Sequence, residues 1–142
     1  MNKALLIPLI FMIMILPAAG GQFYIQGEAV KDISLTLGVS SIDFGDVYSN
    51  NDVDAVPVDF YVNAEESYDY RVEISSDDDT GVLQISKSLN GGYTKGSITY
   101  IETGTGTDQS YYFYVDLDTG VIREDISATI TVMVAYEEIA QQ

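Results

Sequence analysis

The chain has 142 residues, with 22 acidic and six basic side chains and no histidine or cysteine. Without cysteine the chain has no disulfide and no thiol nucleophile, and without histidine it lacks the commonest transition-metal ligand. These two absences exclude most hydrolase and zinc chemistry. The net charge of −16 argues against binding nucleic acid or an anionic membrane surface, because both begin with basic side chains on phosphates. Composition therefore favours a single domain that is not an enzyme and needs no cofactor or metal.

The first 20 residues have the three-part pattern of a secretory signal peptide. Lys3 supplies a positive charge, residues 4–16 form an uncharged apolar run, and Pro17 precedes the small residues 18–20. The apolar run is short for a membrane span of about 20 residues. We expect cleavage after Gly20, secretion, and no membrane insertion of the mature chain; an uncleaved anchor is the alternative. Loss of Lys3 leaves five bases against 22 acids, a net charge of −17.

Seven segments of the mature chain alternate apolar and polar residues, which is the period of a half-buried strand. They lie at 33–39, 58–62, 68–74, 83–85, 98–100, 111–117 and 126–136. Turn residues separate them, and no window has a convincing helical period. Met133 and Ala135 make the last segment apolar on both faces, which predicts a central or covered strand. The whole pattern predicts an all-β sandwich of seven or more antiparallel strands.

Some acidic sequences suggest chemistry but are better explained as turns. Asp79-Thr80-Gly81 and Asp118-Thr119-Gly120 repeat the triplet of the aspartic proteases, yet valine follows the glycine in both copies. Residues 116–120 begin like an EF-hand loop but lack its glycine at position six and its helices. Solvated acidic turns are the preferred interpretation, and weak structural calcium at 43–54 or 77–79 is the alternative.

Three tyrosines, Tyr61, Tyr112 and Tyr114, alternate out of phase with the expected core residues. Exposed tyrosines on a sheet stack on sugar rings, become buried at a subunit interface, or pair across strands. The sequence leaves these three interpretations open.

Several segments together resemble secreted pilin-like domains, in the order and spacing that those domains have. Residues 24–30 resemble the F-x-G-x-V-V segment near the start of chaperone–usher pilins. Residues 42–47 (IDFGDV) resemble the motif after the first strand of pilins and of spore-coat-protein-U-like domains. Residues 126–137 are similar to their closing strand, an alternating run that ends in a tyrosine, and 111–117 to the aromatic strand before it.

The resemblance implies an immunoglobulin-like β-sandwich that lacks its last strand and is completed by a donated N-terminal strand of another subunit. The implied donor residues are Phe23, Ile25, Gly27 and Ala29. The implied wall of the acceptor groove consists of Ile126, Ala128, Ile130, Val132, Val134 and Tyr136. The implied partners are further copies of the chain, in a homopolymer, and an assembly chaperone.

The sequence departs from this family pattern in two ways. It has no cysteine where those pilins carry a disulfide, and only about four residues precede Ile25 after cleavage. Either residues 21–31 are the donor segment and the domain occupies 32–142, or that strand belongs to a complete sandwich. The first alternative predicts a structural subunit of an extracellular pilus-like or fimbria-like fibre assembled by donor-strand exchange. The second predicts a monomeric surface module that binds a glycan or protein through its tyrosine-rich sheet face.

Overall fold

The structure is a computed structural model that describes residues 9–12, 24–27 and 29–137. Its strands, in chain order, are β1 (Leu9–Met12), β2 (Tyr24–Gly27), β3 (Ser34–Leu37), β4 (Val56–Asn63), β5 (Asp69–Ser76), β6 (Leu83–Ser86), β7 (Ile98–Thr103), β8 (Asp108–Leu117) and β9 (Ile130–Tyr136). One turn of 3₁₀ helix, η1 (Thr119–Val121), lies between β8 and β9.

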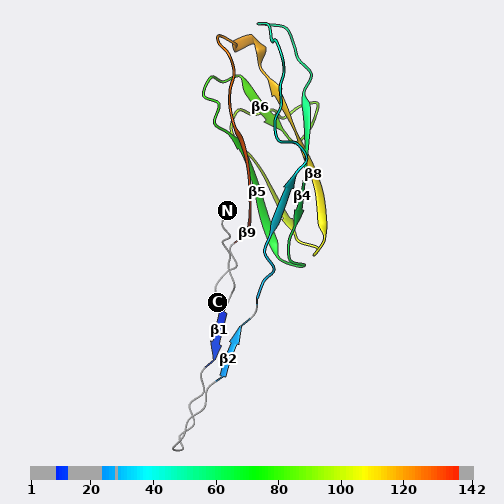
Figure 1. The fold of residues 1–142 in the computed structure, drawn as a ribbon, viewed down its shortest axis with the longest axis vertical. Helices are drawn as coiled ribbons and strands as arrows, with labels where there is room; N and C mark the ends of the chain where they lie inside the picture. Colours follow the sequence, from blue (N-terminus) through cyan, green and yellow to red (C-terminus); the bar gives the residue numbers. More distant parts are fainter. Residues whose placement is uncertain (1–8, 13–23, 28, 138–142) are drawn as a thin grey trace, which may run out of the picture.

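Strands β3 to β9 form two antiparallel sheets that pack against each other (Figure 1). One sheet has the order β3-β4-β8-β6 and the other the order β7-β5-β9. Each of the seven alternating segments overlaps one of these strands, so the predicted all-β sandwich is confirmed. The hairpin of β1 and β2 lies beyond one end of the sandwich (Figure 1).

The strand order is that of an immunoglobulin-like sandwich with one position that no described strand fills. Strands β3, β4, β8 and β6 occupy the positions of immunoglobulin strands A, B, E and D, and β5 and β9 occupy those of C and F. Strand β7 is an addition on the other edge of β5. Strand G of that fold lies beside strand F. Among the described residues, no strand pairs with this edge of β9.

The core between the sheets is made by the inward residues of β4, β5 and β8. Phe60 is fully buried, and its ring lies 5.4 Å from that of Tyr111 and 5.7 Å from that of Tyr100. The Tyr70 side chain is also fully buried, and its hydroxyl bonds to the Tyr111 hydroxyl and to Gln109 Oε1. Burial and the bond to Tyr111 raise the pKa of Tyr70 far above its usual value, so this phenol stays neutral.

The predicted closing strand differs from the structure in two respects. It starts at Ile130 rather than Ile126, because residues 126–129 lie alongside a loop instead of a strand. Strand β9 is an edge strand, and Met133 is 61% exposed on its outer face, so the prediction of a central or covered strand is wrong for the single chain. The alternation itself holds, because the even-numbered residues of 126–136 pack against the core.

Candidate functional site: an open groove between the two sheets

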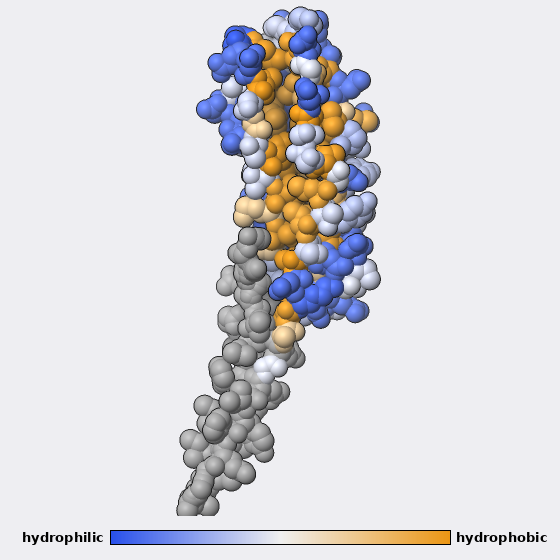
Figure 2. Space-filling view, viewed as in Figure 1, coloured by the Kyte–Doolittle hydropathy of each residue, from blue (hydrophilic) through white to orange (hydrophobic). Residues whose placement is uncertain are grey.

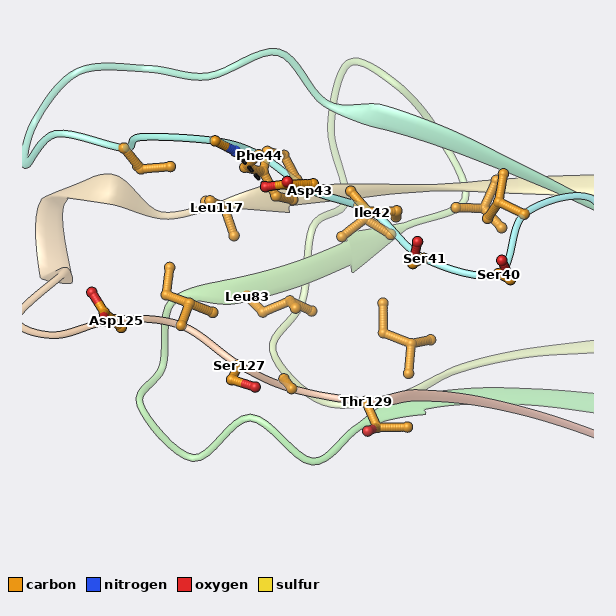
Figure 3. A pocket seen from close by; sticks show the side chains of 18 of the residues that line it. Ser40, Ser41, Ile42, Asp43, Phe44, Leu83, Leu117, Asp125, Ser127 and Thr129 are labelled. Atoms are coloured by element: carbon orange, nitrogen blue, oxygen red, sulfur yellow. Dashed lines mark hydrogen bonds between the residues drawn. The ribbon is translucent and has the colours of Figure 1, made fainter.

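An open apolar groove runs along one side of the sandwich, between the segment that follows β3 and the segment that leads into β9. Its volume is about 990 Å³, with residues 37–48 on one wall and residues 122–132 on the other. Core residues form its floor: Val58, Leu83, Phe113, Val115 and Leu117. Figure 2 shows apolar surface running lengthwise along this face between hydrophilic margins. In Figure 3, Leu83 and Leu117 lie between the segment of Ser40–Phe44 and that of Asp125–Thr129.

The first wall consists of chain that has left the β-ladder. Gly38 N donates the last bond to β4, at 2.8 Å from Asp59 O, and a Cβ on Gly38 would lie 2.0 Å from Asp59 Oδ1. Beyond it, no main-chain bond joins residues 39–47 to another strand of the described chain. Four apolar residues of this segment nevertheless pack against the core: Val39, Ile42, Phe44 and Val47.

A tight turn shapes this wall at Gly45. The Gly45 N–H donates to Asp43 Oδ1 at 2.8 Å, and Gly45 has φ +70°, which is a backbone conformation that glycine adopts without strain. The turn separates Phe44 from Val47, and both side chains still reach the core. The motif at 42–47 therefore builds one side of the groove.

The second wall presents unpaired backbone groups as well as apolar side chains. Asp77 N donates to Thr129 O at 3.1 Å and Glu137 N to Asp69 O at 2.9 Å, so the odd-numbered residues of β9 bond to β5. In an antiparallel ladder the intervening residues direct N–H and C=O to the opposite edge. The even-numbered residues from Ala128 to Val134 thus direct their N–H and C=O groups to a strand position that no described strand fills, while their side chains point between the sheets. An added strand would satisfy both.

The structure brings four of the six predicted wall residues together in the groove: Ile126, Ala128, Ile130 and Val132. Val134 and Tyr136 lie nearer the end of the sandwich, where they pack against the core outside the groove lining. The opposite wall was not predicted from the sequence. Its apolar residues at 39, 42, 44 and 47 were visible, but only the fold places them across from β9.

The predicted donor residues that the structure describes, Ile25, Gly27 and Ala29, lie away from this groove in the single chain. Strand β2 pairs with β1, with Leu9 opposite Gly27 and Met12 opposite Tyr24. Gly27 and Ala29 are exposed, and Phe23 lies outside the described residues. Strand β1 falls within the predicted signal peptide, so the predicted cleavage would remove the partner of β2.

Hydrogen bonds at the base of the sandwich fix where the N-terminal segment joins the domain. The Tyr136 hydroxyl donates to Lys31 O at 2.7 Å and accepts from Glu65 N at 2.8 Å. Lys31 N donates to Glu65 Oε1 at 3.2 Å, and Lys31 Nζ donates to Gly106 O at 3.1 Å. Tyr136 therefore ties the end of β9 to the chain just before β3.

We expect Tyr136→Phe to lower the free energy of unfolding by about 1 kcal/mol, because both bonds of the hydroxyl are lost. Amide exchange at residues 31–33 should accelerate as the junction loosens. Urea unfolding and amide exchange measure the two effects. Tyr112→Phe is the matched control, because among the described residues its hydroxyl has no protein partner. Equal effects of the two substitutions would contradict this role of Tyr136.

The three predicted surface tyrosines lie on the outer face of the β3-β4-β8-β6 sheet. Tyr61 is 37% and Tyr112 55% exposed, and Tyr114 is half-buried. The rings of Tyr112 and Tyr114 meet edge to face with centroids 5.6 Å apart. Tyr61 is opposite Ser110, the next residue on that face of β8 before Tyr112. This face is therefore separate from the groove.

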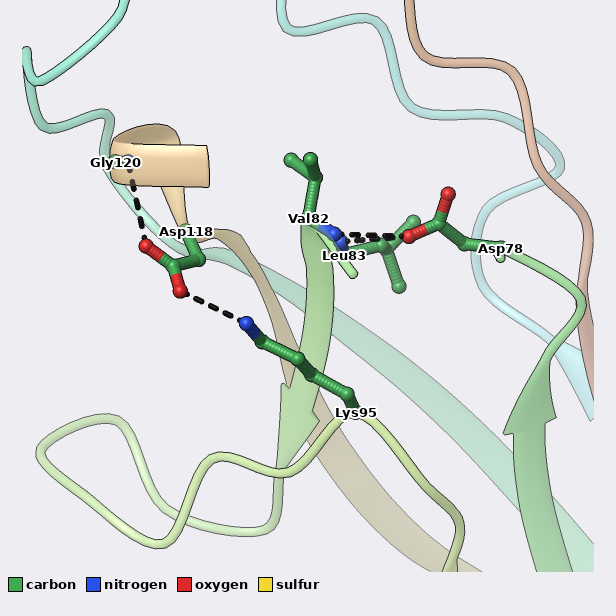
Figure 4. Close-up of polar contacts among 6 residues, drawn as sticks. All are labelled: Asp78, Val82, Leu83, Lys95, Asp118 and Gly120. Atoms are coloured by element: carbon green, nitrogen blue, oxygen red, sulfur yellow. Dashed lines mark hydrogen bonds and ion pairs between the residues drawn. The ribbon is translucent and has the colours of Figure 1, made fainter. Parts of the chain in front are cut away.

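The two protease-like triplets lie in turns, and Figure 4 shows the contacts of Asp118 in one triplet and of Asp78, which directly precedes the other. Asp118 accepts from Lys95 Nζ at 2.8 Å and from Gly120 N at 3.3 Å, and the bond from Lys95 holds its pKa below the usual value. In the other turn, Asp78 accepts from Val82 N, Leu83 N and Thr80. Among the described residues, no group of three or more acidic side chains is placed to hold a metal ion.

Asp78 organises the turn that starts β6. Partial burial raises the pKa of this carboxyl, but the bonds from Leu83 N, Thr80 and Val82 N outweigh burial and leave the pKa below its usual value. A lowered folded-state pKa means that the carboxylate stabilises the fold above its unfolded pKa of about 4. That contribution is lost as the pH falls through the folded-state value.

We expect Asp78→Ala to lower the free energy of unfolding by about 2 kcal/mol at pH 7, because four donors, three backbone N–H groups and the Thr80 hydroxyl, lose a charged acceptor. The difference from the unsubstituted chain should shrink as the pH falls below about 4. Urea unfolding at a series of pH values measures this. Asp79→Ala is the control, since Asp79 is exposed. A difference that stays constant down to pH 2 would refute the role of the carboxylate.

Comparison with protein-family models finds none that matches this chain, and comparison with curated proteins finds no match either. The described residues include no helix long and apolar enough to cross a membrane. The geometry itself defines the class of site: an apolar trough between the free edge of β9 and the irregular segment that follows β3, which suits an extended chain segment.

Proposed function

We propose that the mature chain is a structural subunit of an extracellular pilus-like fibre, in which residues 21–31 of one copy fill the groove of the next. The observation that carries this proposal is the unfilled strand position beside β9. The first and last strands of the sandwich, β3 and β9, flank this position. An N-terminal segment outside the sandwich comes before β3 in the chain. The assembly needs no cofactor.

The groove favours a β-strand over a compact ligand. The wall of residues 124–132 has the length of a strand of about 30 Å. Along it lie both unpaired backbone groups and a row of apolar side chains, so a bound strand gains main-chain bonds and side-chain burial together. A sheet edge left open in this way also promotes aggregation unless it is covered. Polymerisation covers the edge of every subunit except the last.

The donor is a second copy because the chain's own segment is too short to fill its groove. Folding back would require a turn at residues 31–32, which pairs residue 30 with Ile33 and residue 21 with Ile42. Ile25 would then reach only Gly38, and the groove beside Phe44 and Val47 would stay open. The bonds from Tyr136 to Lys31 and from Lys31 to Glu65 also hold this junction in place.

Charge opposes assembly, since each mature subunit carries a net charge of −17 after loss of Lys3. Salt at about 0.15 M screens exposed charges that are more than about 8 Å apart. The apolar burial and main-chain bonds in the groove are short-range and are not screened. Assembly is therefore best examined at physiological salt or above.

The test is negative-stain electron microscopy of the mature chain from residue 21, with SDS gels of boiled and unboiled samples. We expect fibres, and an unboiled ladder that collapses to monomer on boiling, because a strand buried along its length leaves only when many contacts break together. A cooperative, well-folded monomer in physiological salt would contradict the proposal.

A second candidate function is binding of a sugar or partner protein through the tyrosine face. The half-exposed Tyr112, set edge to face against Tyr114, is the observation that favours it. Such rings stack on the apolar faces of sugars. Glycan-array binding that disappears in Tyr112→Ala with Tyr114→Ala, at unchanged fold, would support this function.

A further inference from the structure

We propose that the donor strand runs antiparallel to β9 of the acceptor, with Ile25 opposite Ala128 and Gly27 opposite Ile126. This inference rests on the proposed function and specifies its partner contact. It follows from two features of the described chain. One is the hydrogen bond from Tyr136 to Lys31 beside the end of β9, and the other is the order of large and small residues along the groove wall.

The direction follows from where the donor's own domain has room. At the end of β9, the Tyr136 hydroxyl bonds to Lys31 O, so the acceptor's own chain lies beside this end of the strand position. A parallel donor would place its residue 31, and the domain that follows, against this junction. An antiparallel donor places them beyond Ile122, at the loop end of the groove. Subunits then follow one another along the long axis of the sandwich.

The register follows from residue size. The wall presents Glu124, Ile126, Ala128 and Ile130 in turn, and the donor presents Phe23, Ile25, Gly27 and Ala29. With Ile25 opposite Ala128, a large residue meets a small one, and Gly27 makes room for Ile126. Phe23 then meets Ile130, which is an aromatic and β-branched pair of the kind that stabilises sheets.

The neighbouring registers fit less well. A shift of two residues in one direction sets Gly27 opposite Ala128, which leaves a cavity between the two smallest residues. The shift in the other direction sets Ile25 opposite Ile126, which crowds two β-branched side chains. It also places Gly27 opposite Glu124 instead of opposite Ile126. Only the proposed register alternates large with small at both Ile126 and Ala128.

The test uses engineered cysteines, which the chain's lack of native cysteine makes unambiguous. The proposed register sets Gln26 opposite Ser127 and Tyr24 opposite Thr129. Ser127 and Thr129 are odd-numbered, so their main-chain groups point towards β5 and away from the donor. Both pairs are therefore non-hydrogen-bonded pairs, with Cα atoms about 4.5 Å apart, which is within the range for disulfides. The matched control joins Gln26→Cys with Thr129→Cys, a diagonal pair about 7–8 Å apart that lies outside this range.

Each double variant of the mature chain is oxidised mildly, boiled in SDS without reductant and run on a gel. We expect both opposite pairs to give a ladder of covalent multimers that reductant collapses, and the diagonal control to remain monomeric. Mixing the two single variants, Gln26→Cys and Ser127→Cys, should give a covalent dimer and no ladder.

Other results overturn the inference in distinguishable ways. A ladder from the diagonal control alone would mean a register shifted by two residues, with fibre assembly intact. A ladder from Gln26 with Ser127 but not from Tyr24 with Thr129 would mean a parallel donor. Cross-linked monomers, or the absence of both cross-links and fibres, would instead refute the proposed function.

Discussion

The substitution Ile25→Asp should abolish fibre formation by the mature chain while leaving the free energy of unfolding of its sandwich unchanged. Residue 25 precedes the sandwich, so its replacement removes no contact within the domain. In the fibre it loses about 2 kcal/mol of apolar burial and places a carboxylate in an apolar groove. A combined loss of at least about 3 kcal/mol weakens association by more than about a hundredfold. Electron microscopy and sedimentation measure the loss.

Two variants separate donor from acceptor defects. Gln26→Asp adds the same charge at the neighbouring position, which points out of the groove, and should still form fibres. Ala128→Arg should block the groove but keep the donor. The Ile25→Asp chain keeps an intact groove, and the Ala128→Arg chain keeps an intact donor strand. An equal mixture of the two should therefore form heterodimers only. Fibres from Ile25→Asp alone would show that another surface holds the assembly together.

The second large effect is on folding, at Gly104 between β7 and β8. A Cβ added there would lie 2.2 Å from Glu65 O and 3.0 Å from the carbonyl carbon of Ala64. The loop has no room to move, because Gly104 N donates to Tyr68 O at 2.8 Å and Gly104 O accepts from Ser67 N at 3.0 Å. We expect Gly104→Ala to lower the free energy of unfolding by about 3 kcal/mol, measured by urea unfolding.

The measurement is best made in the Ile25→Asp background, so that assembly does not contribute to apparent stability. Gly91→Ala is the matched control, because a Cβ on Gly91 meets no atom within 4 Å and its φ lies outside the left-handed region. It should change stability by less than about 0.5 kcal/mol. Similar values for the two substitutions would mean that the Gly104 loop tolerates a backbone shift.

Periodicity predicted most of the fold because one apolar face per strand is a local property of the sequence. Alternation located all seven sandwich strands, and the even-numbered residues of 126–136 face the core as expected. Whether a strand is central or at an edge is not local. Met133 and Ala135 suggested cover on both faces, yet among the described residues β5 is the only strand that pairs with β9. On the proposed function, that uncovered edge is where the next subunit binds.

The groove was only half visible in the sequence. Alternation marked one apolar face that includes Ile126, Ala128, Ile130 and Val132, and only the pilin resemblance implied that this face is a groove wall. The apolar residues Ile42, Phe44 and Val47 lack a simple period because Gly45 turns the chain between them. The Tyr136 junction joins residues far apart in sequence: Lys31, Glu65 and Tyr136 itself. No local pattern marks such a contact, so only the fold reveals it.

Amide hydrogen exchange tests most directly whether a donated strand covers the free edge of β9. In the assembled protein, the N–H groups of Ala128, Ile130 and Val132 should be protected at least about a hundredfold more than in the Ile25→Asp monomer. The odd-numbered amides of Thr131, Met133 and Ala135, which already bond to β5, serve as internal controls and should be protected in both. Fibres whose even-numbered amides exchange as fast as those of the monomer would contradict the account.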